Sequence, residues 1–229
     1  MAERLLSKTC DSVVCISEHE ANSGLAIGIS NSKLELVKNG VSLMAPISFS
    51  TVIWPDKRLR LLFVGRLDHQ KGYDLILEAL RELRDVAFAI IVGEFVVDVP
   101  SIANLPDNVS IVGWKSRVEL VDYYKGAEIL VMPSRWEGFG LTAVEAMRNN
   151  LPVFASAVGG LREIVAHGET GILFPPNSSQ AIVDAVRSVD RNLLRRMGQS
   201  GRRRFEDYFT AERMATEVDF LYHRLVAGQ

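Results

Sequence analysis

Two glutamates and a glycine-rich turn form the stretch of this sequence best suited to chemistry. Glu137 and Glu145 bracket the segment E-G-F-G-L-T-A-V-E, which follows an apolar run over residues 129–132 and opens a helical pattern near Gly140. A strand, a glycine-rich turn and a helix in this order aim backbone N–H groups and the positive helix end at an anion. Glu145 would lie roughly 8 Å along the helix axis, at about 1.5 Å per residue. One acid can flank a bound anionic group while the other reaches a neutral hydroxyl, and a sugar nucleotide has both features.

Two cations are expected near this turn. Arg66 follows the end of a predicted strand at Gly65, and Lys71 begins the next predicted helix. Arginine forks bidentately onto phosphate oxygens and lysine supplies a point charge, so the pair matches the charge of a diphosphate. Fixed cations there would stabilise a departing diphosphate in glycosyl transfer. The alternative is that either residue is a solvated surface charge.

The glycines of the turn admit a second interpretation. Gly138, Gly140 and Ala143 fit a dinucleotide fingerprint as well as an ordinary tight turn. A dinucleotide site expects an acid near the end of the next strand to hold the ribose. Residues 151–162 contain neither Asp nor Glu, which weighs against a nicotinamide or flavin cofactor.

The two glutamates also have less specific interpretations. Glu145 would interact favourably with the dipole at its helix N-terminus, and Glu137 would simply be exposed in a turn. A hydrolytic acid/base pair is less attractive, because one carboxyl group would need a buried setting to raise its pKa. No D-x-D pair or H-x-x-x-H spacing is present to hold a metal ion. We therefore predict no metal, and no cofactor besides the sugar nucleotide itself.

Composition limits the remaining classes of protein. The 229 residues are 48% hydrophobic and 24% charged with a formal net charge of −2, which does not call for nucleic acid as a partner. Cys10 and Cys15, predicted to share one strand segment, are too few for a disulfide scaffold. With no apolar run of about 18 residues and no signal-peptide pattern, a cytoplasmic location is expected. The basic run Arg202–Arg204 is predicted to be a solvated helix face, with peripheral contact to an acidic membrane as the alternative.

Short apolar runs alternate with helical patterns and position these groups. Strands are expected at residues 59–64, 87–92, 109–112, 129–132, 152–155 and 168–174, with helices at 72–84, 116–125 and 140–148 and after Gly159-Gly160. Residues from 177 onward are predicted to be helical, ending in a helix over 210–225. The alternation predicts an α/β fold: a Rossmann-like parallel sheet with helices on both faces, binding its ligand at the carboxyl ends of the strands. Residues 1–45 are interpreted as the remnant of a preceding domain, 46–58 as a linker and 59–229 as the nucleotide-sugar-binding domain.

These motifs resemble the C-terminal, donor-binding half of retaining glycosyltransferases of the GT-B type. The resemblance rests on P-S-R-W-E-G-F-G-L-T-A-V-E-A-M, with seven residues between its two glutamates, and on three further stretches in the same order. These are V-G-R-L-D-H-Q-K-G-Y-D-L-I-L-E-A-L, S-A-V-G-G-L-R-E-I-V and H-G-E-T-G-I-L-F-P-P. The sequence departs from the family at Phe95, where a second glycine often follows the strand that ends at Gly93.

The resemblance implies a role for each candidate residue. The donor diphosphate would bind Arg66, Lys71, Gly138, Gly140, Leu141 and Thr142. The donor sugar would contact Glu137, Phe139 and Gly140, with Glu137 as the catalytic residue. Glu145 would bind the ribose, and the base would lie near Val112, Gly113 and Trp114.

The resemblance also implies the reaction and its partners. Such enzymes transfer a sugar from a UDP- or GDP-sugar to a glycan or lipid-linked acceptor, with retention and without a metal. Most of the first domain, which carries the acceptor site, has no counterpart here, so we expect an acceptor domain or partner chain to complete the site. The alternatives are a non-catalytic nucleotide-sugar-binding module and a sugar-nucleotide epimerase of the same fold.

Overall fold

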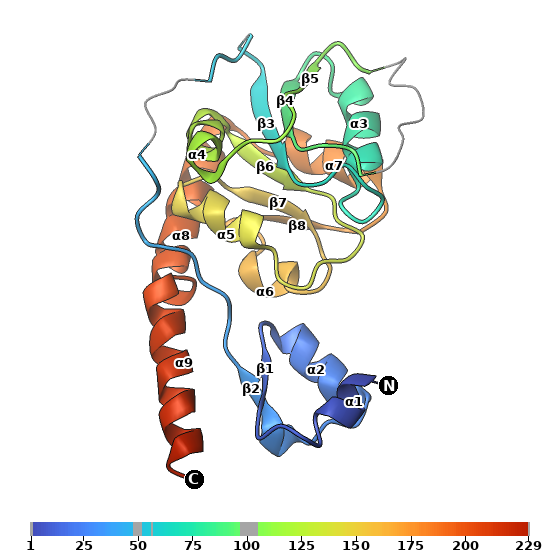
Figure 1. The fold of residues 1–229 in the computed structure, drawn as a ribbon. Coiled ribbons are helices and arrows are strands. Elements are labelled where there is room, and N and C mark those ends of the chain that lie inside the picture. The colour runs from blue at the N-terminus through green and yellow to red at the C-terminus, as the bar shows by residue number, and fades with distance from the viewer. Residues whose placement is uncertain (1, 48–51, 56, 97–104, 229) are drawn as a thin grey trace.

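A computed structural model describes residues 2–47, 52–55, 57–96 and 105–228. Figure 1 labels the helices and strands in chain order. They are α1 (Ala2–Leu6), β1 (Val13–Cys15), α2 (Glu18–Ala26), the 3₁₀ turn η1 (Asn31–Lys33), β2 (Leu34–Leu36), β3 (Leu59–Val64), α3 (Tyr73–Glu82), β4 (Ala87–Val92), β5 (Val109–Ile111), α4 (Arg117–Gly126), β6 (Ile129–Met132), α5 (Leu141–Arg148), β7 (Val153–Ser156), α6 (Leu161–Ile164), β8 (Gly171–Phe174), α7 (Ser179–Arg187), α8 (Arg191–Tyr208) and α9 (Ala211–Val226).

The larger sheet has six parallel strands in the order β5-β4-β3-β6-β7-β8. Every residue of β6 and β7 is buried, which explains why their sequences are continuous apolar runs rather than alternating ones. Helices α3 and α7 pack together on one face, with Ile76 and Val183 in the core there. Helices α4 and α5 and the C-terminal part of α8 cover the other face, while Leu194 and Met197 near the start of α8 lie in the first core (Figure 1). The predicted Rossmann-like α/β fold is confirmed.

Most element boundaries lie within one or two residues of the sequence prediction, and two differences have local causes. The strand predicted from residue 168 begins at Gly171, because the Ala166 N–H donates to the Thr170 hydroxyl oxygen at 3.0 Å and holds a turn. Cys10 lies outside β1 rather than in one strand with Cys15. Its carbonyl oxygen instead accepts a hydrogen bond from the Lys33 ammonium group at 2.7 Å.

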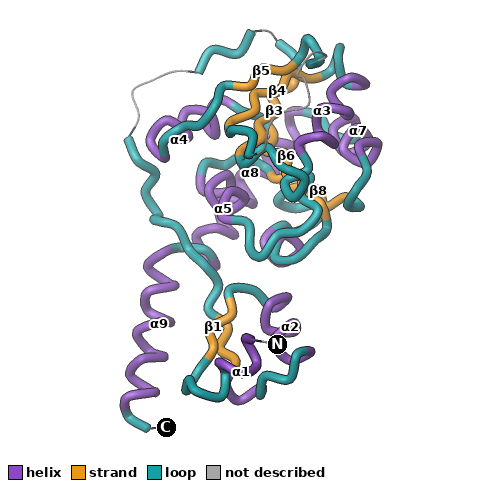
Figure 2. The backbone as a smooth tube through the Cα atoms, turned by 45° about the vertical axis from the view of Figure 1, so that its right-hand side comes forward, coloured by secondary structure: helices purple, strands orange, loops and turns teal. Residues whose placement is uncertain are grey.

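A smaller unit stands beside the large sheet. Strands β1 and β2 pair in parallel with each other, and α2 packs against both. Helix α9 runs alongside this unit, as Figures 1 and 2 both show. Arg224 of α9 forms an ion pair with Glu35, and Arg213 donates to the Lys38 carbonyl oxygen at 2.5 Å. The N-terminal residues are therefore held against α9, the last helix of the chain.

The segment predicted to be a linker has no helix or strand at the residues that the structure describes, which exclude 48–51 and 56. It is nonetheless packed: Val52 and Trp54 lie against the core, and Trp54 lies next to Gly126 at the end of α4. None of the helices placed in the structure is long and apolar enough to cross a bilayer.

The prediction that the basic run Arg202–Arg204 forms a solvated face of α8 is wrong for two of its three residues. Arg202 donates to the Arg148 carbonyl oxygen at 2.5 Å and pairs with Glu206 at 2.7 Å. Arg204 donates to the Glu163 and Ile164 carbonyl oxygens at 2.7 and 2.8 Å. Consecutive helical residues point about 100° apart, so a run of three cannot share one face. Of the three side chains, Arg203 is exposed.

The turn after β7 packs directly onto the turn after β6. Gly159 has a φ of 45°, and a Cβ on it would overlap the Glu137 carbonyl oxygen. The neighbouring Gly160 N–H donates to that same oxygen at 3.3 Å. Glycine is required here both for its backbone conformation and for the lack of space.

We predict that Gly159→Ala lowers the free energy of unfolding more than Gly168→Ala. Gly168 has a φ of 81°, and a Cβ on it would meet no other atom within 4 Å, so its substitution isolates the backbone cost, about 1–2 kcal/mol. Gly159→Ala adds overpacking, typically about 1–3 kcal/mol. Urea denaturation of both variants measures the difference. Equal losses in the two variants would contradict the prediction, because they would show that the turns after β6 and β7 accommodate a side chain at Gly159 without added cost.

Candidate functional site

The carboxyl ends of the parallel strands bring the predicted residues to one edge of the sheet. Strands β3 and β6 are neighbours, paired through Leu61↔Ile129 and Leu62↔Leu130. The loop after β3 carries Arg66 and Lys71, and the loop after β6 carries Glu137. Groups that are far apart in the sequence therefore face each other at this edge.

Lys71 and Glu137 form a close ion pair. The Lys71 Nζ atom lies 2.5 Å from Glu137 Oε2, with the side chains 20% and 11% exposed. The Ser134 hydroxyl donates to the same carboxylate oxygen at 3.4 Å, and the Lys71 N–H donates to Asp68 Oδ1 at 2.9 Å. The predicted diphosphate cation and the predicted sugar-binding acid thus share one charged centre.

Arg66 lies on the same loop but contacts its own neighbours. Its guanidinium donates to Gln70 Oε1 at 2.8 Å and lies 3.2 Å from Asp68 Oδ2. The side chain is 54% exposed, so it can reorient toward an anion. The structure brings Arg66 to the predicted edge without joining it to Glu137.

The start of α5 is open to a ligand. Gly140 precedes the helix with a φ of 110°, and no side chain of the described residues caps it. The first N–H groups of a helix have no partner within the helix, so those of Leu141 and Thr142 are available to an anion. Phe139 differs from its neighbours, because its ring is buried and packs edge-on near Phe209 at 6.1 Å between centroids. Any contact of Phe139 with a ligand must therefore come from its backbone.

Glu145 is held by a residue that the sequence did not single out. The Tyr124 hydroxyl donates to Glu145 Oε2 at 2.8 Å. Burial raises the pKa of the Tyr124 phenol well above its ordinary value, and the charge of Glu145 acts in the same direction. Tyr124 therefore stays protonated and remains a donor at neutral pH. A tyrosine in an ordinary helical pattern carries no sequence signal for this contact.

A pocket of about 440 Å³ lies beside Glu145. It is bounded by residues 40–46, by α4 and by α5. Its helical lining comprises Arg117, Leu120 and Tyr124 of α4 and Leu141, Glu145 and Arg148 of α5. A second pocket, of about 710 Å³, lies between α2 and the turn that carries Glu137. The α5 N-terminus and its two glutamates thus lie between two open spaces.

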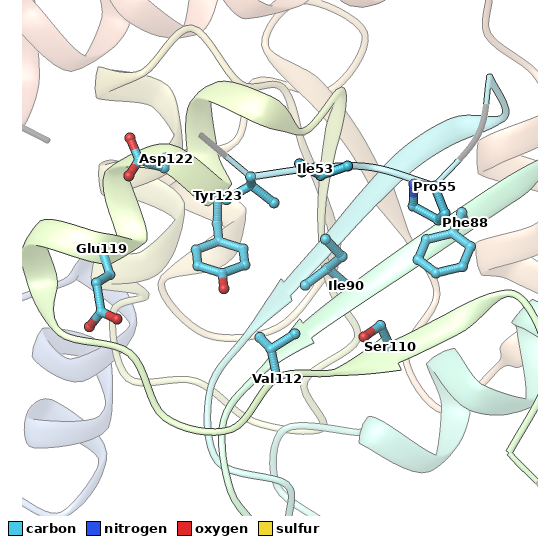
Figure 3. Close-up of a pocket in the computed structure, with 10 residues that line it drawn as sticks. Ile53, Pro55, Phe88, Ile90, Ser110, Val112, Glu119, Asp122 and Tyr123 are labelled. Atoms are coloured by element: carbon cyan, nitrogen blue, oxygen red, sulfur yellow. The ribbon is translucent and has the colours of Figure 1, made fainter. Parts of the chain in front are cut away.

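Of the predicted base-proximal residues, Val112 lines a different pocket. Figure 3 shows Val112 beside Ile90 and Ser110 on the sheet and opposite Tyr123 of α4. This pocket has a volume of about 560 Å³. Gly113 adopts a φ of 72° and accepts a hydrogen bond from the Gly93 N–H, while Trp114 is 67% exposed. The three residues do not line the pocket beside Glu145, and their contact with a base stays a prediction.

Phe95, at which the sequence departs from the family pattern, packs against Tyr73 of α3. Its ring meets Tyr73 edge-on at 5.4 Å between centroids. Gly93 remains indispensable two residues earlier, because a Cβ there would overlap the Gly65 carbonyl oxygen. The loop after β4 therefore lies tightly against the loop after β3.

Arg135 is a second residue that sequence reasoning missed. Its guanidinium forms a fork with the Asp74 carboxylate, at 2.8 and 2.6 Å. The hydrogen bond from Arg135 holds the pKa of Asp74 below its ordinary value, and the same contact raises the pKa of Arg135. Arg135 joins the loop that carries Glu137 to the helix that follows Lys71.

Across the described residues, no three His, Cys, Asp or Glu side chains are grouped so that they could hold a metal ion. The histidines instead have separate settings. His167 Nδ1 accepts from the Leu173 N–H at 3.0 Å, and the His69 ring lies 6.1 Å from that of Trp136.

Comparison with known proteins identifies the family. Residues 47–204, more than half of the chain, match the family described as "Glycosyl transferases group 1". The chain belongs to this family. An uncharacterized 41.2 kDa protein in the cps region of Klebsiella pneumoniae is 35% identical over 194 residues, which cover 81% of this chain and 54% of that protein. The chain therefore spans about half the length of this curated relative.

Solved structures share the fold of this group 1 glycosyltransferase chain. A sucrose-phosphate synthase from Thermosynechococcus elongatus is similar with a TM-score of 0.85 and 29% identity, over 99% of this chain and 61% of that one. The Anabaena protein HepE, solved in complex with UDP-glucose, is similar with a TM-score of 0.80 and 19% identity, over 95% of this chain and 64% of that one. The second likeness concerns the fold alone.

We predict that Tyr124→Phe lowers the free energy of unfolding by about 1.5–3 kcal/mol, because it removes a hydrogen bond to a charged group. The matched control is Tyr123→Phe, at the adjacent position of α4, which should change stability by less than about 0.5 kcal/mol. Urea denaturation at pH 7 measures both. A loss in the control as large as that in Tyr124→Phe would assign the effect to the helix rather than to the Glu145 contact.

Proposed function

We propose that this chain is the donor-binding half of a retaining glycosyltransferase. In this proposal it binds a UDP- or GDP-sugar and takes part in moving the sugar to a glycan or lipid-linked acceptor, without a metal. The observation that carries the proposal is the meeting of Lys71 with Glu137 beside the uncapped N-terminus of α5. A cation, free helix N–H groups and a carboxylate at one point suit a phosphate joined to a sugar.

The charges of this site favour the departure of a nucleoside diphosphate. In the proposed reaction the bond between the sugar C1 and the β-phosphate oxygen breaks, and the acceptor hydroxyl oxygen bonds to C1. The acceptor proton passes to the released diphosphate. Lys71, Arg66 and the N–H groups of Leu141 and Thr142 would stabilise the negative charge that develops on the leaving group.

The glutamates would orient the donor on either side of the diphosphate. Glu137, already held by Lys71 and Ser134, would accept hydrogen bonds from the donor sugar. Glu145 would accept from the ribose, with Tyr124 fixing the orientation of its carboxylate. The base would then extend toward residues 112–114. A carboxylate with lone pairs to spare is a natural acceptor for sugar hydroxyls.

The family and the shared fold support this assignment. Group 1 membership indicates glycosyl transfer, and a protein of the same fold has been solved with UDP-glucose. Because the chain spans only part of its relatives' length, we propose that an acceptor domain or partner chain completes the active site. In this proposal the acceptor would approach through the 710 Å³ pocket between α2 and Glu137. We propose a cytoplasmic location, and Arg202 and Arg204, which bind backbone carbonyls, add no support for a membrane contact.

We predict that a uridine or guanosine diphosphate raises the melting temperature of this chain, since a ligand that binds the folded state stabilises it. Lys71→Ala should weaken binding by about 1.5–3 kcal/mol, the contribution of hydrogen bonds to charged groups. Isothermal titration calorimetry measures the affinity, with the exposed Lys125 on α4, as Lys125→Ala, for the matched control. Unchanged affinity in Lys71→Ala would remove the residue from the donor site. Absence of binding to any nucleoside diphosphate would refute the proposal itself.

We further predict that a chelator leaves this affinity unchanged. Lysine, arginine and helix N–H groups supply the positive charge that a Mg²⁺ ion would otherwise bring to a diphosphate. Titrations with EDTA and with excess MgCl₂ should give the same dissociation constant. Binding that requires the added Mg²⁺ would overturn metal independence while leaving the donor site in place.

A further inference from the structure

The contact between Arg135 and Asp74 joins the two loops that carry the charged centre. Arg135 lies in the turn after β6, and Asp74 lies in the first turn of α3. Their fork has distances of 2.8 and 2.6 Å, and the Arg135 side chain is 14% exposed although it lies at the ligand edge. A bidentate fork restricts both the separation and the relative orientation of the groups that it joins.

Further hydrogen bonds continue from this fork between the same loops. The other contact of the Arg135 guanidinium is the His69 carbonyl oxygen, at 2.8 Å. The Arg135 N–H donates to the Gln70 carbonyl oxygen at 2.8 Å, and the Gln70 side-chain amide donates to the Trp136 carbonyl oxygen at 3.3 Å. Arg135 therefore contacts residues on both sides of Lys71.

The loop after β3 and the loop after β6 are also in direct backbone contact, at a point with no room for a side chain. Gly72 has a φ of 69°, and a Cβ on it would overlap the Pro133 carbonyl oxygen. Lys71 and Glu137 are thus adjacent to, or within two residues of, points at which the two loops are fixed to each other. A change in the fork would be transmitted to the separation of Lys71 Nζ and Glu137.

A simpler role for the Arg135–Asp74 contact is a contribution to stability alone. An exposed ion pair usually adds little to stability, and a carboxylate in the first turn of a helix interacts favourably with the helix dipole. Neither effect requires a largely buried arginine with three separate acceptor oxygens at the rim of a ligand site. A fork placed between two loops is better suited to preorganising the groups that those loops carry.

We propose that Arg135 and Asp74 are a positioning pair that sets the geometry of Lys71 and Glu137 for the donor diphosphate. This inference rests on the proposed donor site. The two residues bind each other and the backbone of the loop that carries Lys71, so in this proposal they act through Lys71. A lysine at position 135 would keep the charge but could not form the fork.

The test compares a nucleoside diphosphate with its monophosphate. Calorimetry on the 229-residue chain would use UDP and UMP, or GDP and GMP if thermal shift selects guanosine. We expect Arg135→Lys and Asp74→Asn each to weaken diphosphate binding about tenfold, which is about 1.4 kcal/mol. Monophosphate binding, which does not need the β-phosphate contact of Lys71, should change less than about twofold in both variants.

The control is a pair at the opposite end of the sheet strands. Arg84 and Asp107 form an exposed contact at 3.0 Å, and Arg84→Lys should bind both nucleotides like the parent chain. The double variant Arg135→Lys, Asp74→Asn should be no worse than either single variant, because the two residues act as one unit. Melting temperatures of all variants, measured in parallel, report any general loss of structure.

The outcomes separate the inference from the function on which it rests. Equal losses of diphosphate and monophosphate binding, or no loss of either, would overturn the positioning role while leaving donor binding established. Additive effects of the two substitutions would show that the residues do not act together. A parent chain that binds no nucleoside diphosphate would refute the donor site itself, and the inference with it.

Discussion

The pairing of β3 with β6 is the constraint on which the candidate site depends. Because these strands are parallel neighbours, their carboxyl ends lie side by side, and the loops that leave them must pass each other. One loop carries Lys71 and the other carries Glu137, so the strand order places opposite charges at a shared edge. The ion pair between them then lies beside the start of α5, where backbone N–H groups add to the positive potential.

Close packing of turns preserves this arrangement. Gly72 lies against the Pro133 carbonyl, Gly93 against that of Gly65, and Gly159 against that of Glu137. Each contact excludes a side chain, so the ligand edge of the sheet is built from backbone in direct contact with backbone. A side chain at any of these three positions would push the neighbouring loop away, so glycine is required at each.

The N-terminal residues and α9 form a second level of organisation. Glu163 of α6 accepts hydrogen bonds from the Glu18 and His19 N–H groups, both at 3.0 Å, and lies 3.3 Å from Lys38. These contacts place α2 opposite the turn that carries Glu137. The smaller unit therefore contributes one wall of the cleft next to the proposed donor site.

The sequence by itself determined the elements, the fold class and the edge at which the candidate residues gather. Apolar runs mark buried strands, glycines mark their carboxyl ends, and the parallel topology brings those ends together. The partners of individual side chains were decided only by the tertiary structure: Tyr124 for Glu145, Asp74 for Arg135, and backbone carbonyls for Arg202 and Arg204. Local patterns record which stretches of the chain are apolar and where its turns lie. The partner of a polar group depends on which distant segments become neighbours, and that follows from the packing of the whole chain.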